Sequence, residues 1–421
     1  MNLAPEETSS ATPVIDLDIG IVGGGIAGLW LANRLTALGY QTALFEKTAL
    51  GSNQTVASQG MIHGGIKYTL AGSLTGASES VADMPNYWKQ CLAGTGDVDL
   101  TSAKTLSDHF YFWSSKSASS KVSTFFASKA VHGRIDKVSV ENYPSVFQTP
   151  NFSGQVYQLE DIVLDISSVL TALKSPIEKN IFLLPEENAD WKINDQGNAE
   201  LHIHSKDKKI IVRAKRFIFS AGKGNNHLLR ALNIKKPEMQ TRPLHQVWVK
   251  HNYSHQFFGH CLGADSTPRL SISSHPSLDG KTVWSLGGSI AENGVKQSED
   301  EVIDAAKKEL KSLFPWLDFS DAEFIAVRID RAEAKQRNFL RPDKAFVKPA
   351  NSVDNVLVTW PTKLTLAPNL TNEVISLLNK SNITPAQKNN ANDLDQLNFL
   401  GHPDIALPPW ETPLEQQGSL S

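Results

Sequence analysis

A glycine-rich turn near the start of the chain has the residue spacing of a phosphate-binding motif. Residues 19–22 are apolar and run into Gly23, and Gly25 and Gly28 follow in the pattern GxGxxG. In such a motif Gly23 would permit a tight turn out of a strand, Gly25 would let the backbone approach a pyrophosphate, and Gly28 would let helix and strand pack closely. A helix that begins at this turn would offer free N–H groups and a partial positive charge to the phosphates. The turn therefore predicts a dinucleotide site.

The segments on either side of the turn have the patterns needed to position it. A helical pattern of apolar residues covers 29–38, and a second apolar run, Thr42–Phe45, ends in Glu46. In dinucleotide-binding βαβ units an acidic residue about 20 positions after the glycines binds the ribose hydroxyls. We therefore expect Asp16–Lys47 to form a βαβ unit, with Glu46 at the ribose and Lys47 next to it.

Composition narrows the class of protein. The chain has 421 residues, of which 40% are hydrophobic and 20% charged, with a formal net charge of -3. This length predicts two domains, and the near-balanced charge gives no case for nucleic acid or an anionic membrane as a partner. The two cysteines, Cys91 and Cys261, are too few for a disulfide framework or a cysteine-built zinc site, and no metal-ligand spacing such as HExxH occurs. We find no signal peptide pattern and no apolar run long enough to span a membrane. The expected location is cytoplasmic, with peripheral membrane attachment left open.

The rest of the chain alternates strand and helix patterns. The apolar stretch FIFSAG, residues 217–222, ends in Ala221 and Gly222 before a helix opens, so a second backbone segment can lie close to a nucleotide. Asp165 is a candidate helix cap. Further strands are expected at 181–184, 199–204 and 210–212 as a meander, and at 244–249, 257–262, 270–273 and 282–287 as a separate, mostly antiparallel sheet. Helices are expected at 299–317 and 371–378 and a buried strand at 355–360, with 385–421 as a tail that docks on the surface.

One further stretch carries a resemblance to a known group of enzymes. Together with the opening unit, ASQGMIHGGIKY (residues 57–68) resembles the FAD-dependent oxidoreductases of the D-amino-acid oxidase superfamily. HGGIKY is most similar to the HGGLRY of flavin glycerol-3-phosphate dehydrogenases, and it is also similar to the IHxGI element of L-2-hydroxyglutarate oxidases. Later segments of this chain resemble, in the same order, the later segments of that superfamily: 156–170, 217–225, 241–249 and 355–370.

The resemblance implies a fold of class α/β with an α+β insertion. A Rossmann-like FAD-binding domain, with a βαβ unit of the glutathione-reductase kind, would be discontinuous. A mainly antiparallel substrate domain would be inserted into it, and a tail would follow. The expected boundaries are 15–75, 150–225 and 345–385 for the FAD-binding domain, 76–149 and 226–344 for the substrate domain, and 386–421 for the tail.

The resemblance also implies an extended FAD, with its pyrophosphate on Gly23–Gly28 and its ribose on Glu46. Residues 57–64 would pass along the isoalloxazine ring. The residues expected to bind the cofactor are Gly23, Gly25, Ile26, Ala27, Gly28, Glu46, Lys47, Ser58, Gln59, Gly60, His63, Ala221, Gly222, Thr362, Lys363 and Leu364.

The chain departs from the family pattern at two places. Lys67 and Tyr68 occupy the positions of an Arg-Tyr pair that helps bind the substrate anion, and a lysine keeps the charge but loses bidentate geometry. Where relatives have glycines after the last strand, this chain has Pro361-Thr362-Lys363. A backbone N–H of Lys363 or Leu364 could reach the flavin, the Lys363 ammonium could stabilise a reduced, anionic flavin, or that side chain could point to solvent.

Several histidines could accept the substrate proton. His63 is the leading candidate because the resemblance places it at the flavin; a structural role and covalent flavin attachment are alternatives. His260 and His275 lie in the predicted substrate sheet and could face the pocket or be core or surface residues.

An arginine is expected to hold the anionic part of the substrate. Arg328, in the segment AVRIDRAEA, is the first candidate, and Arg331 could hold the role instead. Strand alternation does not separate the two while the end of the strand is unknown. A structural ion pair with Asp330 or Glu333 is the alternative, and an exposed pair of this kind contributes little stability.

These features predict an FAD-dependent oxidoreductase. Hydride would pass from a small anionic alcohol or amine, such as a glycerol phosphate, a hydroxy acid or an amino acid, to flavin N5. Oxygen or a quinone would reoxidise the flavin. An amine oxidase that modifies a tRNA or a cofactor amine is a second hypothesis, and a flavin-binding protein without turnover is a third.

Overall fold

The predicted βαβ unit lies at the centre of a sheet in the computed structural model, which describes residues 12–65, 81–115, 135–205, 208–263, 267–336, 344–386 and 392–412. Strand β1 spans Val14–Val22, helix α1 spans Ile26–Ala37, and strand β2 spans Thr42–Glu46. The two strands pair in parallel, with Val22 opposite Phe45. The second half of β1, up to Ile21, and all of β2 are buried, so the apolar runs there are continuous rather than alternating.

The rest of this sheet is organised by one long strand, β12 (Lys208–Phe219). Its first half pairs antiparallel with β11 (Ala199–Ser205), which pairs with β10 (Ala189–Ile193). The pairing of the two later strands of the expected meander is confirmed, but its first strand, 181–184, was wrongly placed, because that segment pairs in parallel with β2. The second half of β12 pairs in parallel with β1 and with β19 (Val356–Trp360). The sequence predicted two separate strands at 210–212 and 217–222; the alternation of buried and exposed residues through the intervening segment joins them. Strand β9 (Ile181–Leu183) extends the far edge beside β2, and β18 (Phe346–Pro349) pairs with β19.

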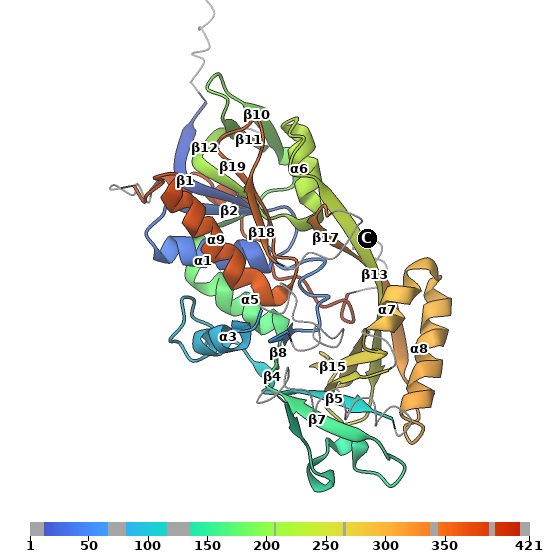
Figure 1. Cartoon of the computed structure of the whole chain (residues 1–421). Helices are drawn as coiled ribbons and strands as arrows, with labels where there is room; N and C mark the ends of the chain where they lie inside the picture. Colours follow the sequence, from blue (N-terminus) through green and yellow to red (C-terminus); the bar gives the residue numbers. More distant parts are fainter. Residues whose placement is uncertain are drawn as a thin grey trace, which may run out of the picture.

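Helices cover one face of this sheet. Figure 1 shows α1, α5 (Ile166–Lys174) and α9 (Ala367–Lys380) side by side, and their apolar faces share one core. Asp165 caps α5 as expected, because its carboxylate accepts the Ser168 N–H at 3.0 Å. Helix α3 (Met84–Leu92) joins the same core, with the rings of Trp30 and Trp88 4.6 Å apart.

The second sheet has the strand order β17-β13-β16-β15-β14-β5-β7-β6 among the described residues. Its strands are antiparallel neighbours except for the parallel pair β14–β5. Helix α8 (Glu299–Leu313) packs on β13 and β17 and begins at Ser298 with a capping box that includes Glu301. The aromatic residues Phe110, Phe112 and Trp113 of β5 are buried in this part of the core. The strands are β5 (Phe110–Ser114), β6 (Ile135–Lys137), β7 (Gln155–Leu159), β13 (Met239–His251), β14 (Phe258–Cys261), β15 (Leu270–Pro276), β16 (Thr282–Gly287) and β17 (Glu323–Ala334).

Short elements connect the two sheets. Strands β3 (Met61–Ile62), β8 (Ile162–Leu164) and β4 (Thr105–Ser107) form a small third sheet. Helices α6 (Asn225–Ala231) and α7 (Ser289–Asn293) follow β12 and β16, and α10 spans Asn392–Asp395. None of the helices in the described ranges has the length and apolar character required to cross a bilayer.

The expected domain boundaries need two corrections. Helix α3 was expected in the substrate domain, but the burial of Trp88 against Trp30 places it in the core of the nucleotide-binding part. Strand β7 was expected in the nucleotide-binding part, but it pairs with β5 in the second sheet. Both exchanges involve segments whose partners are distant in sequence, so local patterns could not reveal them.

Residues 401–412, here called the C-terminal strap, dock on both parts of the molecule. His402 hydrogen bonds through Nδ1 with the Ile181 carbonyl oxygen at 2.6 Å, next to β2. At the other end Trp410 is buried against Trp248 and His275 of the second sheet. The expectation of a docking tail is therefore confirmed for this segment.

The packing of Trp410 on His275 predicts a pH dependence of stability. Burial lowers the pKa of His275 to about 4, whereas a histidine in an unfolded chain titrates near about 6.5. Between these values the unfolded chain binds a proton that the folded chain does not, so the free energy of unfolding falls as the pH drops from about 6.5 toward about 4. The difference in pKa corresponds to about 3 kcal/mol at the acid end.

Urea unfolding of the wild type and of His275→Gln at several pH values would check this prediction. The variant should lose a large part of the acid sensitivity, with a remainder from His251, whose pKa burial and the neighbouring His255 also lower to about 4. Equal acid sensitivity in the two proteins would contradict the assignment to His275.

Candidate functional site

A cavity of about 1220 Å³ opens where the parallel strands of the first sheet end. Val22 of β1 lies opposite Phe45 of β2 and Phe219 of β12, and Phe219 lies opposite Val358 of β19. The residues that follow these strands therefore meet at one edge, which is where ligands bind in open α/β sheets. The cavity extends from this edge to the second sheet, so both parts of the molecule line it.

The glycine turn has the conformation that its sequence predicted. Gly23 has φ +107°, and a Cβ there would lie 2.5 Å from the backbone of Ala221 on the neighbouring strand connection. Gly25 precedes α1 and lines the cavity, and a Cβ added to it would meet only Thr55 Oγ1, at 3.3 Å. The backbone of the turn is thus open to a ligand at Gly25 and closely packed at Gly23.

Gly28 contributes to packing rather than to the cavity. It does not line the cavity, and a Cβ on it would lie 1.9 Å from the Gly23 carbonyl oxygen. This is the helix-to-strand contact that the motif predicted, so Gly28 supports the cofactor site without reaching the cavity.

Glu46 stands at the end of β2 and lines the cavity. Its carboxylate accepts the Gly24 N–H at 2.6 Å and the Thr48 N–H at 3.0 Å. The carboxylate is buried with these two backbone donors, which fix its orientation at the rim where a ribose would lie.

The loop after β19 brings another group of residues to the cavity. Thr362 has a positive φ of 62°, and the Lys363 side chain is only 9% exposed, so the expectation that this lysine could point to solvent is wrong. His63 approaches the same loop: its N–H donates to Thr365 Oγ1 at 3.4 Å, and its side chain is 4% exposed. Lys363 and His63 both line the cavity, and the backbone of His63 is tied to the loop that carries Lys363.

Most residues expected to bind the cofactor line this one cavity. They are Gly23, Gly25, Ile26, Ala27, Glu46, Lys47, Ser58, Gln59, Gly60, His63, Ala221, Gly222, Thr362, Lys363 and Leu364. Lys67 and Tyr68 lie outside the described residues.

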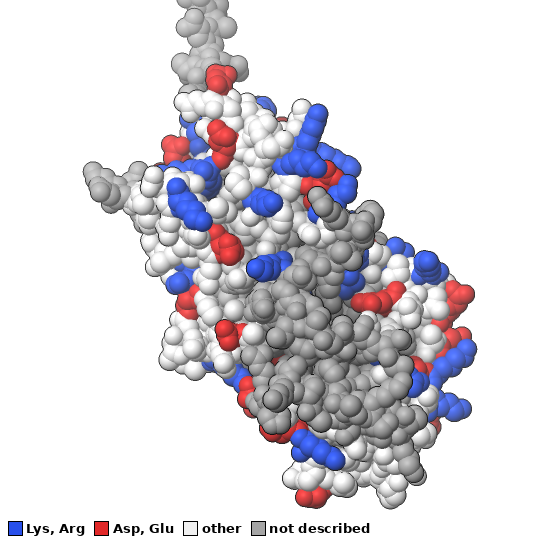
Figure 2. All heavy atoms as spheres, viewed as in Figure 1, with Lys and Arg blue, Asp and Glu red and all other residues white. Residues whose placement is uncertain are grey.

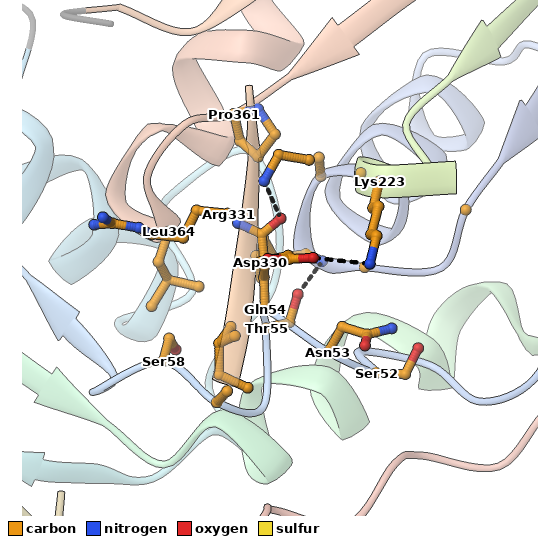
Figure 3. Close-up of a pocket in the computed structure, with 18 of the residues that line it drawn as sticks. Ser52, Asn53, Gln54, Thr55, Ser58, Lys223, Asp330, Arg331, Pro361 and Leu364 are labelled. Carbon is orange, nitrogen blue, oxygen red and sulfur yellow. Dashed lines mark hydrogen bonds and ion pairs between the residues drawn. The ribbon is translucent and has the colours of Figure 1, made fainter. Parts of the chain in front are cut away.

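The placement of the arginines corrects the expected anchor. Arg328 is exposed, does not line the cavity, and donates to the Val295 carbonyl oxygen at 3.3 Å. Arg331 lines the cavity and donates through Nε to the Arg242 carbonyl oxygen at 3.0 Å. Figure 3 shows Arg331 extending toward Leu364, whereas Asp330 points the other way. The alternation of β17, which continues to Ala334, separates the two arginines.

The acidic residues near these arginines have other partners. Asp330 forms an ion pair with Lys223 at 2.8 Å (Figure 3), and the buried Glu333 pairs with Arg242 through Nε at 2.5 Å and Nη2 at 3.2 Å. The cation of Arg242 is thus compensated inside the protein. Asp330 and Glu333 thus link β17 to the segment after β12 and to β13.

The two candidate histidines of the second sheet also differ in whether they reach the cavity. His260 lines the cavity, is 2% exposed, and hydrogen bonds through Nδ1 with Ser271 Oγ at 2.7 Å. His275 does not reach this cavity, because it lies beneath Trp410 with its Nε2 hydrogen-bonded to Ser273 Oγ. His275 is therefore a core residue, and only His260 of this pair faces the site.

Several lining residues were not foreseen. Gln59 donates from the nucleotide-binding part to the Ser285 carbonyl oxygen at 2.9 Å and so closes the cavity against the second sheet. Trp191 of β10, Arg242 and Gln246 of β13, and Ile405–Leu407 of the strap also line it. Trp191 was the one large aromatic residue in an otherwise polar segment, which is a usable signal. The docking of the tail was expected, but nothing in the sequence indicated that the strap would line the cavity.

The described residues contain no group of histidine, cysteine or acidic side chains arranged to hold a metal ion. Cys91 and Cys261 are both buried as free thiols. Burial raises the pKa of Cys91 to about 11 and that of Cys261 to about 12. Neither thiol is therefore activated as a nucleophile.

Comparison with known proteins agrees with this geometry. The family model described as DAO, FAD dependent oxidoreductase, matches residues 18–358. The chain belongs to this family. A probable FAD-dependent oxidoreductase of Pseudomonas aeruginosa is 42% identical over 398 residues, which cover 94% of this chain and 98% of the relative. The resemblance to the D-amino-acid oxidase superfamily is thereby confirmed, and the protein is an FAD-dependent oxidoreductase.

Solved structures confirm the fold class. The crystal structure of the Pseudomonas aeruginosa FAD-dependent oxidoreductase superposes with a TM-score of 0.80 at 37% identity, covering 95% of this chain and 99% of that chain. L-α-glycerophosphate oxidase of Mycoplasma pneumoniae has a TM-score of 0.64 at 16% identity, covering 93% and 100%. Glycine oxidase of Geobacillus kaustophilus has a TM-score of 0.62 at 12% identity, covering 89% and 99%. At these low identities the last two share the fold.

The residues of this chain fit FAD, the cofactor of the family. The open face of Gly25 suits a pyrophosphate, and the oriented carboxylate of Glu46 suits ribose hydroxyls. The cavity is larger than the roughly 300–1,000 Å³ of a typical ligand site, as expected for a cofactor together with a substrate.

Proposed function

We propose that this oxidoreductase dehydrogenates a small anionic alcohol or amine, such as a glycerol phosphate, a 2-hydroxy acid or an amino acid. The observation that carries the proposal is that Arg331, Lys363 and His63 line one cavity. The backbone of His63 is tied to the loop after β19, and Arg331 extends toward Leu364 of the same loop (Figure 3). Two of these side chains are cations, and the third can take up a proton near neutral pH. FAD supplies the acceptor for two electrons when it is bound.

In this proposal Arg331 holds the anionic end of the substrate. Its planar guanidinium can pair with a carboxylate or phosphate in bidentate geometry. The hydrogen bond from Nε to the Arg242 carbonyl oxygen fixes its direction, and the Arg242–Glu333 pair behind it removes a competing cation. Arg331 thus replaces Arg328 in the role of anchor.

Lys363 and His63 have different tasks at the loop after β19. The buried Lys363 places a positive charge beside the loop expected to meet the flavin, where it favours a reduced, anionic ring. His63 accepts the proton from the substrate hydroxyl or amine. Because its backbone is tied to Thr365 and the next residue, Gly64, donates to Asp161 Oδ1 at 2.8 Å, the histidine is held in place.

An anaerobic flavin-bleaching screen tests the proposal. Glycerol 3-phosphate, 2-hydroxy acids and amino acids would be added to the yellow protein, with the matching uncharged alcohols and esters as controls. We expect an anionic compound to bleach the flavin and its uncharged counterpart to leave it oxidised. Bleaching by uncharged or cationic amines alone would overturn the anionic substrate class.

The two cavity histidines can be separated by kinetics. We expect His63→Gln to slow anaerobic flavin reduction at saturating substrate by about 100-fold, a typical loss for a general base. The matched variant His260→Gln should keep most of the rate, because Ser271 of the second sheet already engages its Nδ1. The reverse order of the two rates would transfer the proton-accepting role to His260.

A macromolecular amine substrate has less support. Figure 2 shows Lys and Arg mixed with Asp and Glu over the described surface on this side, rather than a continuous basic stripe. The formal net charge of -3 points the same way. For the electron acceptor, oxygen and a quinone are the two classes that the same anaerobic experiment can compare by reoxidising the bleached protein.

A further inference from the structure

The C-terminal strap is joined to the loop that follows β2. Leu50 donates its N–H to the Asp404 carbonyl oxygen at 2.8 Å, and Ala406 donates its N–H to the Leu50 carbonyl oxygen at 2.9 Å. Both backbone groups of Leu50 are therefore satisfied by the strap, and Leu50 and Ile405 form a parallel bridge. Without the strap this buried peptide would lose both partners.

Leu50 in turn supports the centre of the glycine turn. Its side chain is fully buried, and a Cβ added to Gly24 would lie 2.5 Å from Leu50 Cδ2. The next residue, Gly51, donates its N–H to the Gly24 carbonyl oxygen at 2.9 Å, and Glu46 accepts the Gly24 N–H on the other side. The strap therefore contacts Leu50, and Leu50 supports the glycine turn that would bind the FAD pyrophosphate.

The strap is also part of the cavity wall. Ile405, Ala406, Leu407 and Thr412 line the cavity together with the glycine turn. The first three lie between the docking points at His402 and Trp410, and Thr412 follows Trp410, so an open strap would remove one side of the site.

The far end of the strap carries most of its side-chain contacts. Trp410 is 7% exposed, with its ring centroid 6.2 Å from that of Trp248 and 5.0 Å from that of His275. Glu411 accepts the Leu278 N–H at 2.9 Å and the Ser277 hydroxyl at 2.5 Å, and it lies 3.9 Å from Lys250 Nζ. Docking of the strap therefore depends on Trp410, which packs against the second sheet.

We propose that residues 401–412 are a structural part of the FAD site and that Trp410 positions them. Local opening of a segment held at its end has its own free energy, below that of global unfolding. Opening at Trp410 would expose the cavity wall and release Leu50, which loosens the glycine turn. The release rate of FAD then follows the population of the open strap. This inference needs bound FAD but not the proposed substrate.

The experiment follows the release of FAD from holoenzyme by the rise of free-flavin fluorescence after dilution. We expect Trp410→Ala to release FAD about tenfold faster or more, the factor that a loss of roughly 1.4 kcal/mol of docking produces. Trp410→Phe keeps an aromatic ring in the anchor and should restore a rate close to that of the wild type. Trp316→Ala is the matched control, because Trp316 packs on Phe147 and Phe152 and bonds the Val146 carbonyl oxygen away from the cavity.

Two outcomes would overturn the proposal. One is an unchanged FAD release rate in Trp410→Ala while limited proteolysis cuts the strap faster than in the wild type. The other is wild-type release from a variant that ends at Gly401 and still shows the far-ultraviolet circular dichroism of the full chain. Neither measurement involves substrate, so a negative bleaching screen would leave this inference standing, and normal FAD release in these variants would leave the proposed substrate class standing.

Discussion

Arg331→Ala should lower kcat/KM for the anionic substrate by about 100-fold or more while the protein stays yellow. The loss combines two charge-assisted hydrogen bonds, each worth roughly 1.5–3 kcal/mol. Most of it should appear in KM, because the anchor binds the substrate before and during the reaction. Arg331→Lys keeps the charge without the bidentate fork, so its kcat/KM should lie between those of Arg331→Ala and the wild type.

Arg328→Ala is the matched control for this prediction. It removes the same side chain three residues away on the same strand, where the guanidinium is exposed and donates to the Val295 carbonyl oxygen. Its kcat/KM should stay within about twofold of the wild type, as for most surface substitutions. Steady-state kinetics of the three variants decide the matter: an Arg328→Ala defect as large as that of Arg331→Ala would refute the assigned anchor.

Gly25→Val and Gly28→Ala change the same motif, but the first should lower FAD affinity and the second should lower the stability of the apoprotein. A side chain at Gly25 meets only Thr55 and points into open space beside the cavity, so the apoprotein should unfold nearly like the wild type. FAD affinity should fall by about 100-fold, or roughly 2.7 kcal/mol, because the branched side chain occupies the space of the pyrophosphate. At Gly28 even one methyl group would lie 1.9 Å from the Gly23 carbonyl oxygen.

Gly28→Ala should therefore lower the free energy of unfolding of the apoprotein itself, by about 3 kcal/mol, at the upper end of the usual cost of overpacking. Urea unfolding of the two apoproteins and FAD titration by fluorescence quenching separate the effects. A Gly25→Val apoprotein as unstable as Gly28→Ala would show that the space at Gly25 is required for folding rather than for the cofactor.

The sequence by itself determined the parts of the molecule that depend on local patterns. The βαβ unit, the cap at Asp165 and the loop of Ala221 and Gly222 each follow from residues within one or two elements of each other. Turn geometry, helix capping and apolar periodicity act over short distances in the chain, so they can be read directly. The FAD site was predictable because its motif is local.

Tertiary structure decided which side chains of the second sheet reach the cavity. Arg331 rather than Arg328 faces it because β17 continues to Ala334 in register with β13, and one residue of register reverses every side chain. His260 faces it and His275 does not, because Trp410, more than a hundred residues later, covers His275.

The strap and the exchanged segments have the same explanation. Leu50 pairs with Asp404 and Ala406, β7 pairs with β5, and Trp88 packs on Trp30, and each contact joins segments with no shared local pattern. Such pairings are selected by the burial of apolar surface in the complete fold, which no single window of sequence contains. The cofactor motif can therefore be recognised in a short stretch of sequence. The other residues of the cavity are brought together only by contacts between distant segments.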